Sequence, residues 1–212
     1  MTSPSALLMI VALLWAGPVV AQDAARYPGL HAVTGVAAND ILNIRNAPNA
    51  RADIIGWFPP DDTGVEVIAL SANGRWGKVS RGPRPGWASM AYLTPVPGGQ
   101  DPRRWPVFCT GTEPFWSLHF DATAGTARWS APDESSLTYA MSLAAPQGFD
   151  DPPRMAATLR TEGDAITLMT RAEQCSDGMS DRGFGLSVDL LRNGTGGARH
   201  LRGCCSMDQG DN

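Results

Sequence analysis

The richest concentration of chemically versatile side chains lies in residues 175–182, with the sequence CSDGMSDR. It holds a thiol, the carboxylates of Asp177 and Asp181, two hydroxyls and the guanidinium of Arg182. Glycine and small polar residues in such a run favour a loop over the interior of a helix or strand. Residues 108–116 (FCTGTEPFW) and 201–205 (LRGCC) hold the remaining cysteines. We therefore expect these three segments to converge in one patch.

The polar residues of that patch allow two interpretations. In the first, Glu113, Asp177, Asp181 and Arg182 form a ligand-binding cluster with Trp116 and Phe115 buried beneath it. In the second, Asp177 and Asp181 only cap turns, and Arg182 pairs with Glu113.

Catalysis has weaker support in the sequence. Ser180, His119 and an aspartate supply the residue types of a hydrolytic triad, but no GxSxG elbow frames the serine. His119 is expected to face outward on a strand. The carboxylates also lack the spacing of an EF-hand calcium loop. We assign no catalytic residue. A periplasmic hydrolase using the Glu113, Asp177 and Asp181 region, or an inhibitor using residues 147–153, is the alternative function.

The beginning of the chain predicts export. Residues 7–15 are an unbroken apolar run, followed by Gly17-Pro18 and small residues at positions 19 and 21. Such a segment is typical of a signal peptide cleaved after Ala21, and it is too short to span a bilayer comfortably. The sequence therefore predicts a signal peptide over residues 1–21 and a periplasmic or secreted protein without a membrane span.

Export decides how the cysteines are interpreted. Four cysteines in an oxidising compartment predict two disulfides. A bridge between the neighbours Cys204 and Cys205 would strain the chain. Cys109 and Cys175 are therefore each expected to bond one member of that pair, in either combination. The competing metal site would use cysteine with His200, Met179 and Met207, but no CxxC or HxxxH spacing supports it. We expect no metal and no cofactor.

Composition limits the fold and the partners. The net charge of -4 gives no general reason to expect nucleic acid as a partner. The 23 glycines and 17 prolines in 212 residues favour many turns and short strands over long helices. The sequence thus predicts an all-β protein.

The N-terminal part, residues 27–94, alternates short apolar runs with turns. Strands are expected at residues 42–45, 54–58, 65–70, 75–79 and 85–90, with a hairpin signal at Asn73-Gly74. No helical stretch separates them. This pattern predicts a small, partly open antiparallel barrel.

The same region resembles the bacterial SH3-like (SH3b) domain. The resemblance is carried by Leu42-Asn-x-Arg45, Pro48, Ile55-Gly56, Val65-x-Val67, Asn73-Gly-x-Trp76, Lys78-Val79, Gly86-Trp87 and Tyr92-Leu93. It implies binding to cell-wall peptides, glycans or an envelope partner, without catalysis. An exposed tryptophan, with Trp76 the candidate, beside Arg81 and Arg84 would suit an anionic or carbohydrate ligand. The alternative is that Trp57, Trp76 and Trp87 only fill a core or an interface.

A proline-rich and glycine-rich linker over residues 95–104 precedes a second β-rich domain over residues 105–206. Strands are expected at 115–120, 126–130, 137–143, 154–160, 165–171, 185–191 and 199–201, which favours an antiparallel barrel or sandwich. The last residues, 207–212, are expected to be a disordered tail.

The second domain is also similar to a family, one of exported bacterial proteins of unknown function. The motifs that carry this resemblance are CxGxEPFW (109–116), CSDGMSDR (175–182) and LxGCC (201–205). The resemblance implies an envelope location and no particular reaction. The function we expect is an exported envelope protein whose SH3-like module binds peptidoglycan or a partner, and whose second domain recognises an unidentified ligand.

Overall fold

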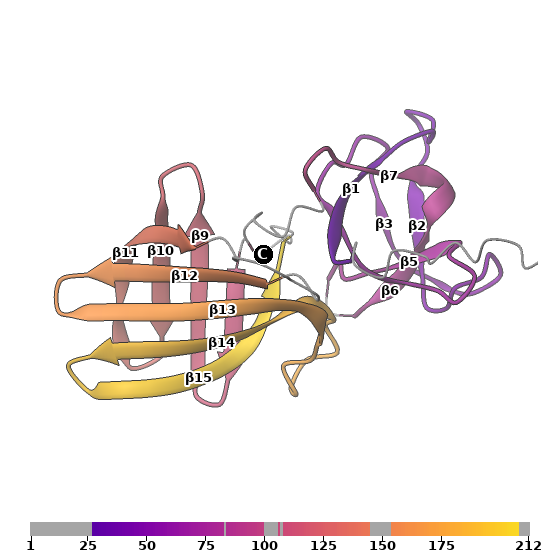
Figure 1. Ribbon diagram of the computed structural model, residues 1–212. Coiled ribbons are helices and arrows are strands. Elements are labelled where there is room, and N and C mark those ends of the chain that lie inside the picture. Colours follow the sequence, from indigo (N-terminus) through magenta and orange to yellow (C-terminus); the bar gives the residue numbers. More distant parts are fainter. Residues whose placement is uncertain (1–26, 83, 100–105, 107, 145–153, 208–212) are drawn as a thin grey trace, which may run out of the picture.

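The computed structural model describes residues 27–82, 84–99, 106, 108–144 and 154–207. The expected signal peptide, linker residues 100–104 and tail residues 208–212 lie outside these ranges, as does the 147–153 loop. Within them the protein is all-β, as the sequence predicts, and its helical element η2 (Met90–Tyr92) is a single 3-10 turn. Figure 1 shows two bodies, a small N-terminal sheet and a larger barrel.

The first body, called the N-terminal module below, is one antiparallel sheet of seven strands. These are β1 (Gly29–Val33), β2 (Leu42–Arg45), β3 (Ile54–Phe58), β4 (Val65–Leu70), β5 (Trp76–Val79), β6 (Gly86–Ser89) and β7 (Leu93–Pro95). Their order in the sheet is β3-β2-β6-β5-β4-β1-β7. The five expected strands are present within a residue of their predicted bounds, whereas β1 and β7 are additional.

The second body is a closed antiparallel barrel of eight strands. These are β8 (Phe108–Thr112), β9 (Phe115–Asp121), β10 (Thr126–Ala131), β11 (Glu134–Ala144), β12 (Arg154–Thr161), β13 (Asp164–Cys175), β14 (Phe184–Gly194) and β15 (Gly197–Ser206). Each strand pairs with the next along the chain, and β15 pairs with β8 to close the barrel. Of the barrel and the sandwich that the sequence favours equally, the barrel is correct.

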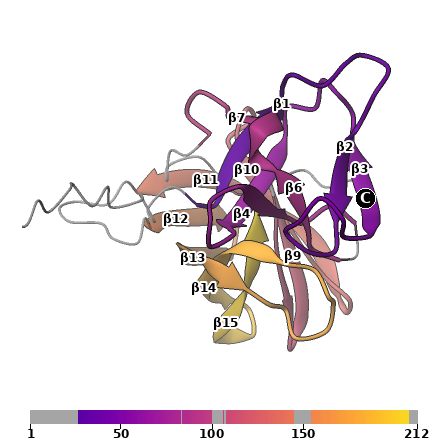
Figure 2. The ribbon, with the colours of Figure 1, turned by 90° about the vertical axis from the view of Figure 1, so that its right-hand side faces the viewer.

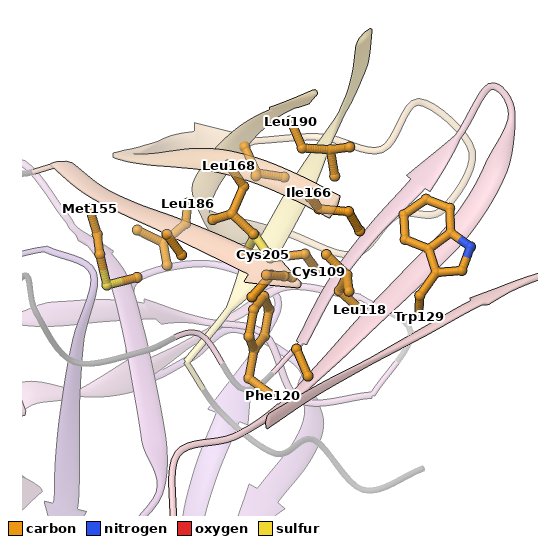
Figure 3. Packing of buried hydrophobic residues seen from close by; sticks show 14 of the residues in the cluster. Cys109, Leu118, Phe120, Trp129, Met155, Ile166, Leu168, Leu186, Leu190 and Cys205 are labelled. Carbon is orange, nitrogen blue, oxygen red and sulfur yellow. A yellow bond between two sulfur atoms is a disulfide. The ribbon is translucent and has the colours of Figure 1, made fainter. Parts of the chain in front are cut away.

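Alternation of apolar and polar residues positions the barrel side chains. In β9, Trp116, Leu118 and Phe120 are buried while His119 is exposed, and in β14 Leu186, Val188 and Leu190 are buried. Successive side chains of a strand point to opposite faces, so such strands present one face to the core and one to solvent. Figure 3 shows several of these side chains together inside the barrel.

The seam that closes the barrel is short, and a disulfide spans it. Strands β15 and β8 pair over only three residue positions, Cys204–Ser206 of β15 opposite Phe108–Thr110 of β8. The bridge between Cys109 and Cys205 joins one of these opposite pairs, with Cα atoms 4.0 Å apart and both residues fully buried. Its place in the core is visible in Figure 3. The bridge therefore fixes the first strand of the barrel to the last.

Two local expectations were wrong. Phe115 is 53% exposed rather than buried, because Trp116 beside it faces inward and neighbouring strand residues face opposite ways. Met207, assigned to a disordered tail, is buried in the barrel core. Strand β8 was also missed, because its sequence FCTGT has too few apolar residues to give a strand pattern.

The two bodies meet where β4 of the N-terminal module contacts β14 of the barrel. Leu30 of β1 is part of the barrel's core cluster, and Val96 packs against the same cluster. Close packing at the junction requires glycine: a Cβ on Gly185 would lie 2.4 Å from Pro28 Cβ. In Figure 1 the loop after β13 lies at this junction, and Figure 2 views the N-terminal module in front of the barrel.

Candidate functional site

The loop between β13 and β14, residues 176–183, is organised by Asp177. Its Oδ1 accepts hydrogen bonds from the backbone N–H groups of Met179 (3.0 Å) and Ser180 (2.8 Å), and its Oδ2 accepts the Ser180 hydroxyl at 2.7 Å. Burial alone would raise the pKa of Asp177, but these hydrogen bonds outweigh it and lower the pKa. Gly178 adopts a left-handed φ of 75°, which a residue with a side chain rarely does. The Asp177 carboxylate is thus used to hold its own turn.

The loop is attached to the barrel through both of the other cysteine segments, residues 201–205 and residues 108–116. A disulfide joins Cys175 to Cys204, and the Thr112 hydroxyl donates a hydrogen bond to the Asp177 carbonyl at 2.8 Å. The convergence of the three cysteine segments is confirmed. Since Cys204 and Cys205 are adjacent on one strand, their bridges leave on opposite faces of the sheet. One bridge lies in the core and the other secures the loop.

The motif glycines make room for Trp116. A Cβ on Gly111 would lie 2.2 Å from Trp116 Nε1, and one on Gly203 would lie 2.8 Å from Trp116 Cζ2. Trp116 also stacks on Trp129, with ring centroids 5.4 Å apart. The glycines of CxGxEPFW and LxGCC therefore serve core packing rather than chemistry.

The second half of the loop faces the N-terminal module. Asp181 pairs with Arg84 at 3.4 Å, and the Gly183 N–H donates to the Ser80 hydroxyl at 3.2 Å. The Arg182 guanidinium lies over the rings of Phe108 (4.9 Å) and Phe184 (5.3 Å). The pairing of Arg182 with Glu113 predicted by the structural interpretation is not found among the described residues.

The four polar residues of the predicted cluster are divided between two hollows. Glu113 and Asp177 line a polar hollow of about 580 Å³ beside the Cys175–Cys204 bridge. Asp181 and Arg182 line a different one, about 380 Å³, which also includes Lys78 and Pro85 of the N-terminal module. The expected single cluster is therefore divided between two adjoining hollows, which share residues 174–176 as lining.

A larger groove lies on the N-terminal module. It has a volume of about 790 Å³ and is lined by Trp76, Tyr92, Ile41, Met90, Arg45 and Arg75, among others. Trp76 is half-buried, whereas Tyr92 and Ile41 are exposed. Sequence reasoning singled out Trp76 but missed the lining residues from the 35–42 loop and from η2, because that loop contains no sequence motif that predicts a binding site.

The basic residues around the β5–β6 hairpin do not form one patch. Arg75 lines the groove, but Lys78 donates to Gln174 at 3.1 Å, across the junction. Arg81 forms an ion pair with Asp62 and lies 5.0 Å from the Phe58 ring, and Arg84 pairs with Asp181. Arg81 and Arg84 therefore lie outside the groove that Trp76 lines.

The three tryptophans of the module differ in exposure. Trp57 is 54% exposed on β3 and does not line the groove, while Trp76 and Trp87 are half-buried.

Sequence reasoning also missed a buried charge network at the other end of the barrel. Arg192, 5% exposed, donates to Asp164 through Nε and Nη2 (2.8 Å to Oδ2) and to Glu134 through Nη1. Its guanidinium lies 4.6 Å from the Trp129 ring. The signal was present in β14: Arg192 continues the inward series Leu186, Val188, Leu190, where an arginine must be paired.

The network perturbs its titratable members. The hydrogen bond from Arg192 lowers the pKa of Glu134 to about 2 despite partial burial. Burial raises the pKa of Tyr139 to about 12. Because the carboxylates and the guanidinium satisfy one another, the network has the character of a structural plug.

The remaining candidates for chemistry lie apart. His119 stacks on Phe108 at 5.9 Å, while the Ser180 hydroxyl donates to Asp177. His200 Nε2 lies 2.9 Å from Asp189, Met179 is exposed, and all four cysteines are in disulfides. Within the described ranges, no group of three or more His, Cys, Asp and Glu side chains is arranged to hold a metal ion.

No helix in the described ranges has the length and apolar character that crossing a membrane requires. The two disulfides are compatible with an extracellular or periplasmic location. A scan against protein-family models, a search of curated proteins and a search of solved structures each found no match. Both family resemblances stay predictions.

Proposed function

We propose that this is an exported cell-envelope protein whose N-terminal module binds peptidoglycan, or a partner attached to it, through the Trp76 groove. The barrel is a rigid recognition domain without catalysis, and its ligand is separate from that of the module. The observation that carries the proposal is the groove itself, with an indole, a phenol and two guanidinium groups around one open volume of about 790 Å³.

The chemistry of the groove suits this ligand. Aromatic rings present flat apolar faces with polar edges, which pack against sugar rings and peptide backbones. Arg75 is exposed, and no ion pair within the described ranges occupies it, so its planar donors can meet a carboxylate. Wall peptides carry such carboxylates. Arg45 instead donates to the Ala52 carbonyl at 2.7 Å and shapes the wall of the groove.

The polar loop of the barrel supports a different role. Asp177 holds its own turn, and the second half of the loop contacts the N-terminal module. These contacts favour a structural bracket between the two bodies over a catalytic site.

Export is supported by the apolar run and small residues before Gln22, and by the absence of free cysteines within the described ranges. Amino-terminal sequencing of the protein from a periplasmic fraction should find Gln22 first. Recovery of Met1 there would contradict cleavage.

Co-sedimentation with purified peptidoglycan tests the proposal. The chain from Gln22 should sediment with the wall, and Trp76→Ala should reduce the bound fraction by about tenfold, as loss of a central aromatic contact does. Trp57→Ala removes an exposed tryptophan outside the groove and is the matched control.

If Trp76→Ala and Trp57→Ala sediment equally with peptidoglycan, the groove is not the binding surface. Failure of the unaltered chain to sediment would remove peptidoglycan as the ligand.

A further inference from the structure

The hollow lined by Asp181 and Arg182 lies between the two bodies and is distinct from the Trp76 groove. It has a volume of about 380 Å³, with Ile68, Lys78 and Pro85 contributed by the N-terminal module and residues 174–176 and 180–184 by the barrel. We call it the junction cleft. Its walls come from β4 and the β5–β6 hairpin on one side, and on the other from the end of β13, the start of β14 and the loop of residues 176–183, called the bracket loop below. The cleft therefore exists only while the two bodies are docked.

Arg182 in this cleft is held in place without using its ion-pairing capacity. Its guanidinium lies 4.9 Å from the Phe108 ring centroid and 5.3 Å from that of Phe184. No residue within the described ranges forms an ion pair with it, and its buried Nε has no hydrogen-bond partner there. Arginine presents five donors in a fixed planar fork, and stacking on rings orients the fork while leaving donors at its edge.

The other half-buried or buried arginines behave differently. Arg81 and Arg192 are paired with carboxylates, and Arg45 donates to a backbone carbonyl. Arg182 is therefore an oriented guanidinium at a cleft, whereas these other arginines are already occupied.

The surroundings of Arg182 favour an anion. Lys78 lines the same cleft and uses one of its donors on Gln174, leaving its charge without a described counter-ion. Ser176 and Ser180 also line the cleft, but their hydroxyls make hydrogen bonds within the loop. The acidic residue that lines the cleft is Asp181, and its negative charge is offset by the ion pair with Arg84. The hollow on the other side of the loop is lined instead by Glu113, Glu173 and Asp177 with Arg202.

We propose that the junction cleft binds the oxyanion group of a small ligand, a carboxylate or a phosphate, between Arg182 and Lys78. The planar fork of Arg182 matches two oxygens of either group, and Lys78 adds a second positive charge. Because the two cations come from different bodies, a bound anion also strengthens their docking. This site is independent of peptidoglycan binding through the Trp76 groove.

Calorimetric titration of the chain from Gln22 with sodium phosphate and, separately, sodium acetate tests the proposal, with sodium chloride at equal ionic strength as the blank. One of the two anions should bind saturably and raise the melting temperature. Stronger binding of phosphate would identify a phosphorylated ligand, and stronger binding of acetate a carboxylate ligand. No saturable binding of either anion would overturn the proposal.

Variants place the site. Arg182→Gln should weaken binding by about tenfold or more, the loss expected for hydrogen bonds to a charged group. Arg182→Lys keeps the charge but lacks the planar fork, so its affinity for the anion should lie between those of the unaltered chain and Arg182→Gln. Lys78→Gln should also weaken binding, whereas Arg75→Gln, in the other groove, should leave it unchanged. If Arg182→Gln does not fold, Lys78→Gln decides, and unaltered affinity in that variant would contradict the site.

Discussion

The bracket loop and the Trp76 groove use their residues in opposite ways. In the loop, a disulfide, an aspartate that caps its own turn and a hydroxyl from Thr112 consume most of the polar groups. In the groove, Tyr92 and Ile41 are exposed around a large open volume. In the first half of the loop, around Asp177, the polar groups are thus occupied with structure, whereas Arg182 in the second half and the residues of the groove leave polar or aromatic surface open.

The bracket loop and the Trp76 groove should therefore respond differently to mutation. Changes in the loop and its bridges should reduce stability without affecting wall binding. Changes in the groove should reduce wall binding at nearly constant stability.

The largest effect on stability is expected from removing the bridge at the barrel seam. Cys109→Ala together with Cys205→Ala should lower the free energy of unfolding by about 4–5 kcal/mol, because the bridge closes a long loop and supports a short strand pairing. Urea unfolding followed by circular dichroism measures this. A loss below about 1 kcal/mol would show that pairing of β8 with β15 suffices by itself.

Removal of the disulfide that holds the bracket loop should have a smaller effect on stability. The Cys175–Cys204 bridge closes a shorter loop, with a sequence separation of 29 residues, so Cys175→Ala with Cys204→Ala should lower the free energy of unfolding by about 3.5 kcal/mol. Hydrogen exchange should become faster in residues 176–183 while the core strands keep their protection. Unchanged exchange in the loop would mean that its own hydrogen bonds hold it.

Asp177→Ala tests the turn directly. Loss of its hydrogen bonds should cost about 1–2 kcal/mol at pH 7, similar to loss of a helix cap. Because folding lowers the pKa of Asp177, its contribution is present above the ordinary aspartate pKa and is lost as pH falls through the folded value. The difference between the unaltered chain and the variant should therefore shrink in acid. A difference that is constant from pH 7 to pH 2 would contradict this role.

The smallest change in stability is expected in the groove. Tyr92→Ala removes an exposed ring and should alter the free energy of unfolding by only about 0.5 kcal/mol. Wall binding should nevertheless fall several-fold, as measured by co-sedimentation, with Asp177→Ala as the comparison that loses stability but not binding. The reverse result for the two variants would invert the comparison.

Local patterns predicted much of this architecture. Apolar runs located most of the strands, the turn signal at Asn73-Gly74 located the hairpin between β4 and β5, and export chemistry predicted the two bridges. The choice between Cys204 and Cys205 as partner of Cys109 could not be made, because it depends on which face of β15 each thiol occupies. That face is decided by the register with β8, which is a long-range property.

The site was less predictable for the same reason. Trp76 could be singled out by residue type, but its neighbours Tyr92 and Ile41 come from segments that only the sheet order brings together. The separation of Glu113 from Arg182 likewise depends on how the loop folds between two bodies. Residue type predicts which groups are available, whereas tertiary contacts decide which of them are already occupied.

The most direct test of the central proposal is a spectrum of the tryptophan indole N–H groups in the nitrogen-15-labelled chain, recorded with increasing soluble peptidoglycan fragments. The account predicts that the Trp76 resonance shifts in a saturable way, while those of exposed Trp57 and buried Trp116 and Trp129 stay in place. A saturable shift at Trp57 with none at Trp76, or no indole shift during demonstrable binding, would contradict the assignment of the groove as the wall-binding surface.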